Sequence, residues 1–173
     1  MHVNNKTTYL LLACALFLGL PVWAPAQSAV ERASRDELTL VPSDDPAMAA
    51  AFKKARDSLD SFIKLLDAPP QGTESYAVKI RISEAGNTEY FWIGNLEREG
   101  KRFIGTLNNT PRSVKSVRQG QSMTFTSAEI YDWSYIDRSQ HRMVGNFTAC
   151  ALLTHESPES AAAFKKQTGL RCD

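Results

Sequence analysis

The spacing of the apolar residues changes near residue 70 from that of a helix to that of a strand, and this change constrains the fold more than any other feature. Between residues 46 and 66, apolar side chains recur at the spacing of one helix face. From residue 75 onward they alternate with polar ones, which is the period of a half-buried strand. One amphipathic helix followed by several strands predicts an α+β fold, with the N-terminal helix packed on a bent antiparallel sheet of five or six strands.

The helix is also marked at both ends. Asp44 and Asp45 offer cap oxygens for its first amides, and Pro46 suits the first helical position. Pro69 and Pro70 end it, because proline lacks an amide donor. The predicted apolar face consists of Met48, Phe52, Ala55, Leu59, Phe62, Ile63 and Leu66.

Three strands follow as a predicted meander. Residues 76–82 alternate apolar and polar side chains, and residues 85–87 (Ala-Gly-Asn) provide a turn. The returning segment 89–93 is apolar on both faces, which predicts a central strand covered on two sides. Gly100 marks the next turn, and residues 102–107 form the third strand.

The rest of the chain is expected to complete the sheet and add a short C-terminal helix. Residues 112–119 carry Val114 and Val117 at a spacing that predicts one helical turn, and residues 122–125 read as a strand. Residues 129–136 and 142–150 predict a final hairpin. Ser157 and Pro158 begin the C-terminal helix, which ends at Gly169. The alternative fold is a small SH3-like barrel with an added helix.

The first 26 residues are typical of a secretory signal peptide, with cleavage after Ala26. A short segment with one lysine precedes an apolar run of about 12 residues, too short for a spanning helix of about 20. We therefore expect a periplasmic or secreted protein without a transmembrane anchor after cleavage. The alternatives are a lipoprotein attached through Cys14 and a retained anchor. Residues 27–43 are polar and aperiodic, as in a flexible leader.

Composition indicates one ordinary globular domain and no polyanionic partner. The chain has 173 residues, 43% hydrophobic and 23% charged, and its net charge is only +1. Nucleic acid is therefore not expected as a partner, and the basic stripe of Arg112, Lys115 and Arg118 is read as a solvated face. After signal cleavage two cysteines remain, Cys150 and Cys172, which predicts a disulfide in an exported chain. Two free thiols are the alternative.

The sequence shows no catalytic or cofactor-binding motif. A Gly-x-Ser-x-Gly elbow, a phosphate-binding glycine loop and a zinc-ligand spacing are all missing. His141 falls in the predicted hairpin turn and His155 in a linker, where both are expected to be solvated. We therefore predict no catalytic residues, no metal and no cofactor.

Two groups of residues remain as candidates for a binding site. Asp132 beside Trp133 could act as an acid with a raised pKa in apolar surroundings, but is better explained as an acceptor of backbone amides at a strand corner, with Trp133 in the core. Tyr90 and Trp92, with Trp133 and Tyr135, could form an aromatic platform for sugar or protein. Aromatic residues at period 2 are more often core.

Several dispersed motifs between residues 44 and 150 resemble the YegJ-like family, catalogued as domain of unknown function 2314. The motifs that carry the resemblance are Asp45-Pro46-Ala47-Met48, Asp67-Ala68-Pro69-Pro70, Tyr76-Ala77-Val78-Lys79-Ile80, Glu89-Tyr90-Phe91-Trp92-Ile93, Gly105-Thr106-Leu107-Asn108-Asn109 and Ile130-Tyr131-Asp132-Trp133. Residues 151–173, with Cys172, are expected to be an extension of that domain.

The resemblance implies a small bacterial domain without an established activity, distantly similar to immunity domains of toxin systems. We accordingly expect an exported, non-catalytic binding module of the bacterial envelope, with a protein partner captured as an immunity protein captures a toxin. Tyr90, Trp92, Asp132 and Trp133 are its candidate binding residues. The alternatives are an enzyme acting on envelope material with Asp132 as acid or base, and a module that binds a small ligand around Trp92.

Overall fold

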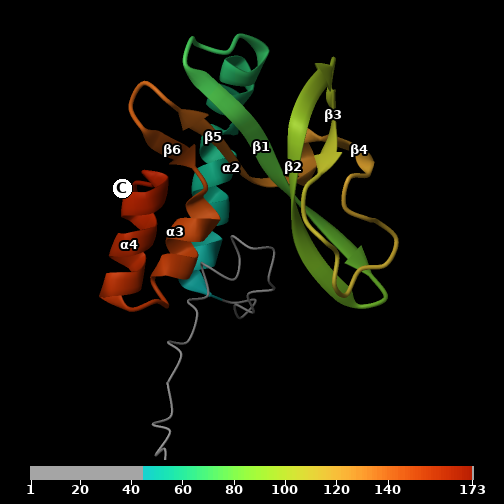
Figure 1. Ribbon diagram of the computed structural model, residues 1–173. Helices are drawn as coiled ribbons and strands as arrows, with labels where there is room; N and C mark the ends of the chain where they lie inside the picture. Colours follow the sequence, from blue (N-terminus) through green and yellow to red (C-terminus); the bar gives the residue numbers. More distant parts are fainter. Residues whose placement is uncertain (1–44, 173) are drawn as a thin grey trace, which may run out of the picture.

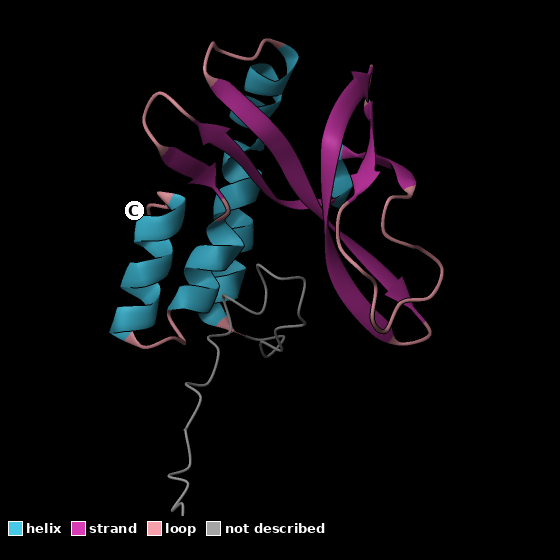
Figure 2. Ribbon diagram, in the orientation of Figure 1, coloured by secondary structure: helices cyan, strands magenta, loops and turns pink. Residues whose placement is uncertain are grey.

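The computed structural model describes residues 45–172, and within them three α-helices and six strands form one α+β unit (Figures 1 and 2). All strand pairs are antiparallel, in the order β4-β3-β2-β1-β5-β6. The elements in chain order are α2 (Pro46–Asp67), β1 (Thr73–Glu84), β2 (Asn87–Glu99), β3 (Arg102–Leu107), β4 (Ser122–Thr126), the 3₁₀ turn η1 (Ser127–Glu129), β5 (Ile130–Asp137), β6 (Arg142–Gly145), α3 (Phe147–Leu153) and α4 (Pro158–Thr168).

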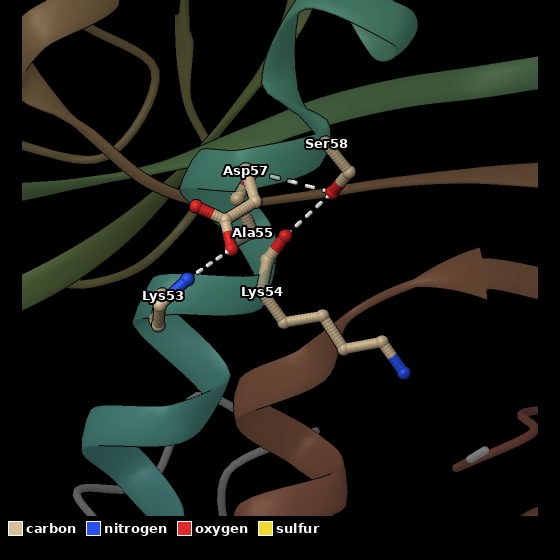
Figure 3. A network of polar contacts seen from close by, with 5 residues as sticks. All are labelled: Lys53, Lys54, Ala55, Asp57 and Ser58. Carbon is tan, nitrogen blue, oxygen red and sulfur yellow. Dashed lines mark hydrogen bonds and ion pairs between the residues drawn. The ribbon is translucent and has the colours of Figure 1, made fainter.

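Helix α2 begins and ends where its sequence predicts. The Asp45 carboxylate accepts the Met48 amide at 2.7 Å, and Pro46 occupies the first turn. Its inner face buries Ala51, Ala55, Leu59 and Phe62. The opposite face is solvated: Figure 3 shows Lys53 and Asp57 paired one turn apart on this outer surface. The prediction of an amphipathic helix is confirmed.

The sheet is open and bent around its long central strands. Strand β1 lies between β2 and β5, and the pairings end at β4 on one side and β6 on the other, so the described strands do not close into the alternative barrel. Register shifts interrupt the β1–β5 and β2–β3 ladders, and such bulges bend and twist a sheet. Residues 89–93 lie in the inner strand β2, as predicted. The predicted cover on both faces of this segment is incomplete, because Tyr90 is exposed.

The main core lies between α2 and one face of the sheet. Phe62 is fully buried and stacks on Trp133, with ring centroids 5.0 Å apart. Phe91 and Phe103 extend this core beneath β2 and β3. Burial of a large apolar side chain contributes about 2–3 kcal/mol, so Phe62 and the rings that it meets contribute strongly to the attachment of the helix to the sheet.

The helical turn predicted for residues 112–119 is wrong. This segment is an irregular loop in which Val114 alone is fully buried. The carboxylate of Glu89 accepts the amides of Arg112 and Ser113 at 3.0 and 2.8 Å, and a bond from Val114 follows at 3.3 Å. Because one side chain takes these successive amides, they are not available for helical bonding to carbonyls.

The predicted final strand 142–150 is also wrong beyond Gly145. Gly145 and Asn146 have φ values of 79° and 54°, a left-handed pair that ends β6 and turns the chain. Residues from Phe147 onward then form α3. The apolar residues of this stretch pack in a helix because Asp132, outside the segment, caps its first amides.

The C-terminal segment forms a second, smaller core around α3 and α4, which lie side by side in Figure 1. Helix α4 begins at the Ser157 cap and ends at Gly169, which has φ 68°. Leu170 is buried beside Leu152 and Leu153. The predicted disulfide is present between Cys150 and Cys172 and ties the end of this segment to α3.

The predicted signal peptide (residues 1–26), its cleavage after Ala26, the lipidation alternative at Cys14 and the leader (27–43) all lie outside the described residues. Of the helices in residues 45–172, none combines the length and the apolar character that a membrane crossing requires.

Candidate functional site

The four candidate binding residues divide between the two faces of the sheet. Trp92 and Asp132 both lie opposite Lys79 across the central strands, and Tyr90 lies opposite Arg81. Because residues two apart share a face of a strand, these side chains lie on one face. Trp133 points to the other face, where it is 6% exposed and its indole nitrogen donates to the Ala55 carbonyl at 3.1 Å. Trp133 is therefore a core residue next to α2.

Asp132 is fully buried and holds the N-terminus of α3. One carboxylate oxygen accepts the Trp133 amide at 2.8 Å and the Phe147 amide at 3.2 Å. The other accepts the Thr148 amide at 2.8 Å and the Thr148 hydroxyl at 2.6 Å. Two of these amides belong to the first turn of the helix, where a negative charge is favourable. Asp132 thus caps α3 from a neighbouring strand.

Lys79 joins this carboxylate through Thr148. The Lys79 ammonium donates to the Thr148 hydroxyl at 2.6 Å, and that hydroxyl donates onward to Asp132. The ammonium also lies 4.6 Å from the centre of the Trp92 ring, a cation–π contact. The Trp92 ring is therefore engaged by a lysine of its own chain. Trp92, Lys79, Thr148 and Asp132 form one continuous row of contacts, in which Thr148 and Asp132 are buried and Lys79 and Trp92 are half-buried.

Burial governs the titration of both charged groups in this network. It raises the pKa of Asp132, against the opposing effects of Lys79 and of the bonds from Thr148 and Trp133. Burial likewise lowers the pKa of Lys79, and Asp132 opposes that shift. Three backbone amides and the Thr148 hydroxyl donate to the Asp132 oxygens, and donors to a carboxylate favour its charged form. Burial and these hydrogen bonds therefore act on the Asp132 carboxyl in opposite directions.

Tyr90 does not contact this network through any bond described above and forms a partly exposed aromatic cluster with the half-buried rings of Phe52 (α2) and Tyr131 (β5). Its ring stacks on Phe52 at 5.5 Å and meets Tyr131 edge-on at 5.4 Å, while Phe52 and Tyr131 are 5.3 Å apart. The guanidinium of Arg81 lies 5.0 Å from the centre of the Tyr131 ring. Tyr90 is 39% exposed, and among the described residues no other large hydrophobic side chain is exposed. We call Phe52, Arg81, Tyr90 and Tyr131 the Tyr90 cluster.

Partial burial raises the pKa of Tyr90, and the positive charge of Arg81 works against that shift. Tyr90 is therefore a neutral phenol at physiological pH. An aromatic ring with a hydroxyl tip and an adjacent guanidinium combine apolar area with directional hydrogen bonding. Tyrosine and arginine are the residue types most enriched at the energetic centres of protein interfaces.

Three members of the Tyr90 cluster are not predicted by the sequence patterns. The helical period places Phe52 in the buried stripe of its helix, and the strand pattern gives Arg81 and Tyr131 no special role. Arg81 could have been found from the predicted turn at 85–87, because that turn pairs residue 81 with residue 90 and so places Arg81 beside Tyr90. The approach of Phe52 depends on how α2 crosses the sheet, which no local pattern encodes.

Within residues 45–172 the two histidines, His141 and His155, have other partners or surroundings. His141 is exposed in the β5–β6 turn, and the His155 ring nitrogen lies 2.7 Å from the Asp45 carboxylate at the start of α2. Residues 45–172 contain no cluster of three or more His, Cys, Asp or Glu that could hold a metal. A hollow of about 420 Å³ lies between α2 and the β2–β3 hairpin, lined by Ile63 and Phe103 among others, and it includes none of the four candidate residues.

These features define the class of protein: a small α+β protein with one internal disulfide and a partly exposed cluster of aromatic rings and an arginine on its sheet. The comparisons with known proteins then give the family. Residues 45–172 match the model of DUF2314, described as an uncharacterized protein conserved in bacteria, and the chain belongs to this family. The matched range continues past residue 150, where the family domain was expected to end, and includes α4 and Cys172.

One relative is the uncharacterized protein YegJ of Escherichia coli (strain K12). It is 32% identical over 126 residues, which cover 73% of this chain and 80% of the relative. No solved structure matches the chain.

Proposed function

We propose that this chain is an exported, non-catalytic module of the bacterial envelope that captures a protein partner, in the manner of an immunity protein that binds a toxin. The observation that carries the proposal is the Tyr90 cluster, in which an exposed tyrosine is held by two aromatic rings beside a guanidinium. Ordered aromatic and arginine side chains bind protein surfaces at low entropic cost, because packing has already fixed their rotamers.

The contacts of Asp132 and Trp92 support binding through Tyr90 and not chemistry at Asp132. Three of the four bonds that Asp132 accepts come from Phe147 and Thr148 and hold β5 to α3, and the Trp92 ring has a lysine of the same chain beside it. An acid or base must reach the proton that it transfers, at about 3 Å. The enzyme alternative would require Asp132 to release α3, and the small-ligand alternative would require Trp92 to release Lys79.

Export is supported by two independent features. Residues 1–26 have the composition of a signal peptide, and the disulfide between Cys150 and Cys172 is typical of oxidising compartments. The intact mass of the native protein tests this part of the proposal. We expect a chain that starts at Gln27 with both cysteines oxidised. A chain that retains Met1, or one lipidated at Cys14, would contradict it.

Site-specific photocrosslinking tests the binding surface. A photoreactive phenylalanine analogue replaces Tyr90 in the full chain expressed in its own host, and a matched variant carries it at Glu159, an exposed residue of α4. We expect one adduct of discrete mass from position 90 and none from position 159. Adding Arg81→Glu should abolish the adduct, because the charge at the cluster is reversed.

The identity of the crosslinked molecule decides whether this chain captures a protein partner as an immunity protein does. A single protein crosslinked in stoichiometric amount supports capture of a partner, and a toxin encoded beside this gene would specify its class. Absence of an adduct at position 90, or equal labelling at both positions, would overturn the assignment of the Tyr90 cluster as the binding surface.

A further inference from the structure

The charge that the sheet presents beside the Tyr90 cluster is positive. On β1 and β2, three pairs of residues face each other here, and their charged members are both cations: Lys79 with Trp92, Arg81 with Tyr90, and Ser83 with Thr88. On β5 the acid of this face is Asp132, which is fully buried and accepts four hydrogen bonds from its own chain. Lys79 is half-buried and Arg81 is exposed, so the guanidinium is the charge that an approaching molecule meets first.

The elements that flank the cluster do not neutralise this charge. One turn along α2 from Phe52, the guanidinium of Arg56 donates to two carbonyls of η1 at 2.7 and 3.0 Å. The carboxylate at the end of that turn, Glu129, accepts the amide and the hydroxyl of Thr126 at 2.8 and 2.9 Å. The ion pairs formed between residues 45 and 172 join other groups, and none of them includes Arg81.

Arg81 is nevertheless held in place by a contact that keeps its charge. Its guanidinium lies 5.0 Å from the centre of the Tyr131 ring, and its strand position is directly opposite Tyr90. A ring face attracts a cation without supplying a countercharge, so the N–H groups at the edge of the guanidinium can still bind an anion. A partner therefore meets a charged group whose side chain is already positioned.

The chemistry of the cluster specifies what it can bind. A guanidinium has five N–H donors and no acceptor, and a neutral phenol such as that of Tyr90 has one O–H donor. A carboxylate supplies two acceptor oxygens in one plane, which match the fork of a guanidinium in a bidentate pair. The rings of Phe52, Tyr90 and Tyr131 add apolar area beside these donors.

We propose that the partner of the Tyr90 cluster is a protein with an acidic surface, which presents an aspartate or glutamate carboxylate to Arg81 and an apolar side chain to the Tyr90 ring. This inference rests on the proposed function and specifies its partner. Charge complementarity selects the occupant, because a basic protein surface would face Arg81 and Lys79 with like charge.

Photocrosslinking from a neighbouring position identifies the contact while the cluster stays intact. A photoreactive phenylalanine analogue replaces Thr88, an exposed residue on the same face, in the full chain expressed in its own host. We expect an adduct with one protein, and mass spectrometry of the crosslinked peptide should locate an aspartate or glutamate at the contact. That protein is then purified for binding measurements.

Binding of the purified partner measures the contribution of the charge. Arg81→Gln should weaken binding by about 30-fold, because it leaves a carboxylate of the partner unpaired in the interface. The matched control Arg118→Gln removes the same charge from an exposed arginine of the 112–119 loop and should change the affinity by less than about twofold. Both variants should keep the urea midpoint of the parent chain, since both side chains are exposed.

Salt and charge exchange test the pairing itself. Raising NaCl from about 50 to about 500 mM should weaken binding of the parent chain and affect Arg81→Gln much less, because screening acts on the missing pair. Arg81→Glu should abolish binding. Replacing the mapped acid of the partner with arginine should restore it to the Arg81→Glu chain.

The outcomes separate this inference from the proposed function. A protein adduct whose affinity is unchanged by Arg81→Gln, or whose mapped contact has no acid, would overturn the acidic partner and leave the binding role of the cluster standing. A lipid or polysaccharide adduct would also overturn it. Absence of an adduct from both position 88 and position 90 would overturn the proposed function and this inference together.

Discussion

Replacing Asp132 with asparagine is the sharpest test of the buried network. Asp132 is fully buried and accepts the Thr148 amide and hydroxyl, together with the amides of Trp133 and Phe147. Asparagine keeps the shape and one acceptor oxygen. It places an amide donor against other donors, and it leaves the Lys79 ammonium without its countercharge.

The expected loss of stability is large. Removing one charge of a buried pair costs about 3–5 kcal/mol, and here the carboxylate is fully buried while the ammonium, bridged to it by Thr148, is half-buried. Each hydrogen bond to a charged group contributes about 1.5–3 kcal/mol, and these terms overlap with the first and do not add to it. We therefore expect Asp132→Asn to lower the free energy of unfolding by about 4 kcal/mol.

Urea unfolding at pH 7, with the disulfide intact, measures this loss. With an m-value of about 2 kcal/mol/M, the midpoint should fall by about 2 M. The matched control is Asp57→Asn on the outer face of α2 (Figure 3), where the side chain is 59% exposed. That variant should cost less than about 0.5 kcal/mol, because exposed pairs contribute little.

The reasoning is refuted if Asp132→Asn is as stable as Asp57→Asn to within about 1 kcal/mol, since the loss of a fully buried carboxylate that accepts four hydrogen bonds must cost several times more than that. Thr148→Val is the milder variant for the case in which Asp132→Asn does not fold. It removes the hydroxyl between Lys79 and Asp132 and should cost about 1–3 kcal/mol. Lys79→Met added to Asp132→Asn should restore part of the loss, because the unpaired charge is gone.

Three further changes probe the loop, the C-terminal segment and the core. Burial alone would raise the pKa of Glu89, but the hydrogen bonds from Ser113, Val114 and Arg112 together lower it below the usual 4.5. The ionised carboxylate therefore stabilises the fold above about pH 4.5, and this contribution is lost as the pH falls through the folded-state pKa. Glu89→Gln should flatten this acid dependence in urea titrations at pH 7 and pH 3, whereas an unchanged slope would contradict the role of the carboxylate. Cys172→Ser should lower stability by about 3 kcal/mol and expose the α4 amides to hydrogen exchange, and an unaffected exchange rate in α4 would count against its anchoring by the disulfide. Phe62→Ala should cost about 3–5 kcal/mol in the same unfolding assay, and a loss below about 1 kcal/mol would mean that the helix is held mainly elsewhere.

The parts of the fold that could be predicted are those whose signals are local. Helix α2 has a cap, a proline at each end and an apolar stripe within one continuous segment. Strand β3 has the predicted bounds because its side chains alternate, a turn with Gly100 precedes it and the Asn-Asn-Thr-Pro segment 108–111 follows it. Helix α4 is predictable from a serine cap and a closing glycine. In each case the residues that determine the element also belong to it.

The parts that could not be predicted depend on distant partners. Helix α3 has seven residues, too few for a helix that is stable by itself, and its first amides are capped by Asp132 of strand β5. The 112–119 loop has helical spacing, but its amides bind Glu89, which precedes it by more than twenty residues. Alternation along the predicted strand 129–136 already places Trp133 and Asp132 on opposite faces, but the bond from Trp133 to Ala55 of α2 and the cap that Asp132 gives α3 depend on distant elements.

The position of β1 has a consequence for the order of folding. One side of this strand pairs with β2 across a tight turn, but the other side must wait for β5, about fifty residues later in the chain. The meander β1–β4 can form without β5, but one side of β1 then keeps an unpaired row of backbone amides and carbonyls. Pairing of β5 fills that row and also places Asp132, the cap of α3, so both halves of the protein depend on this one ladder.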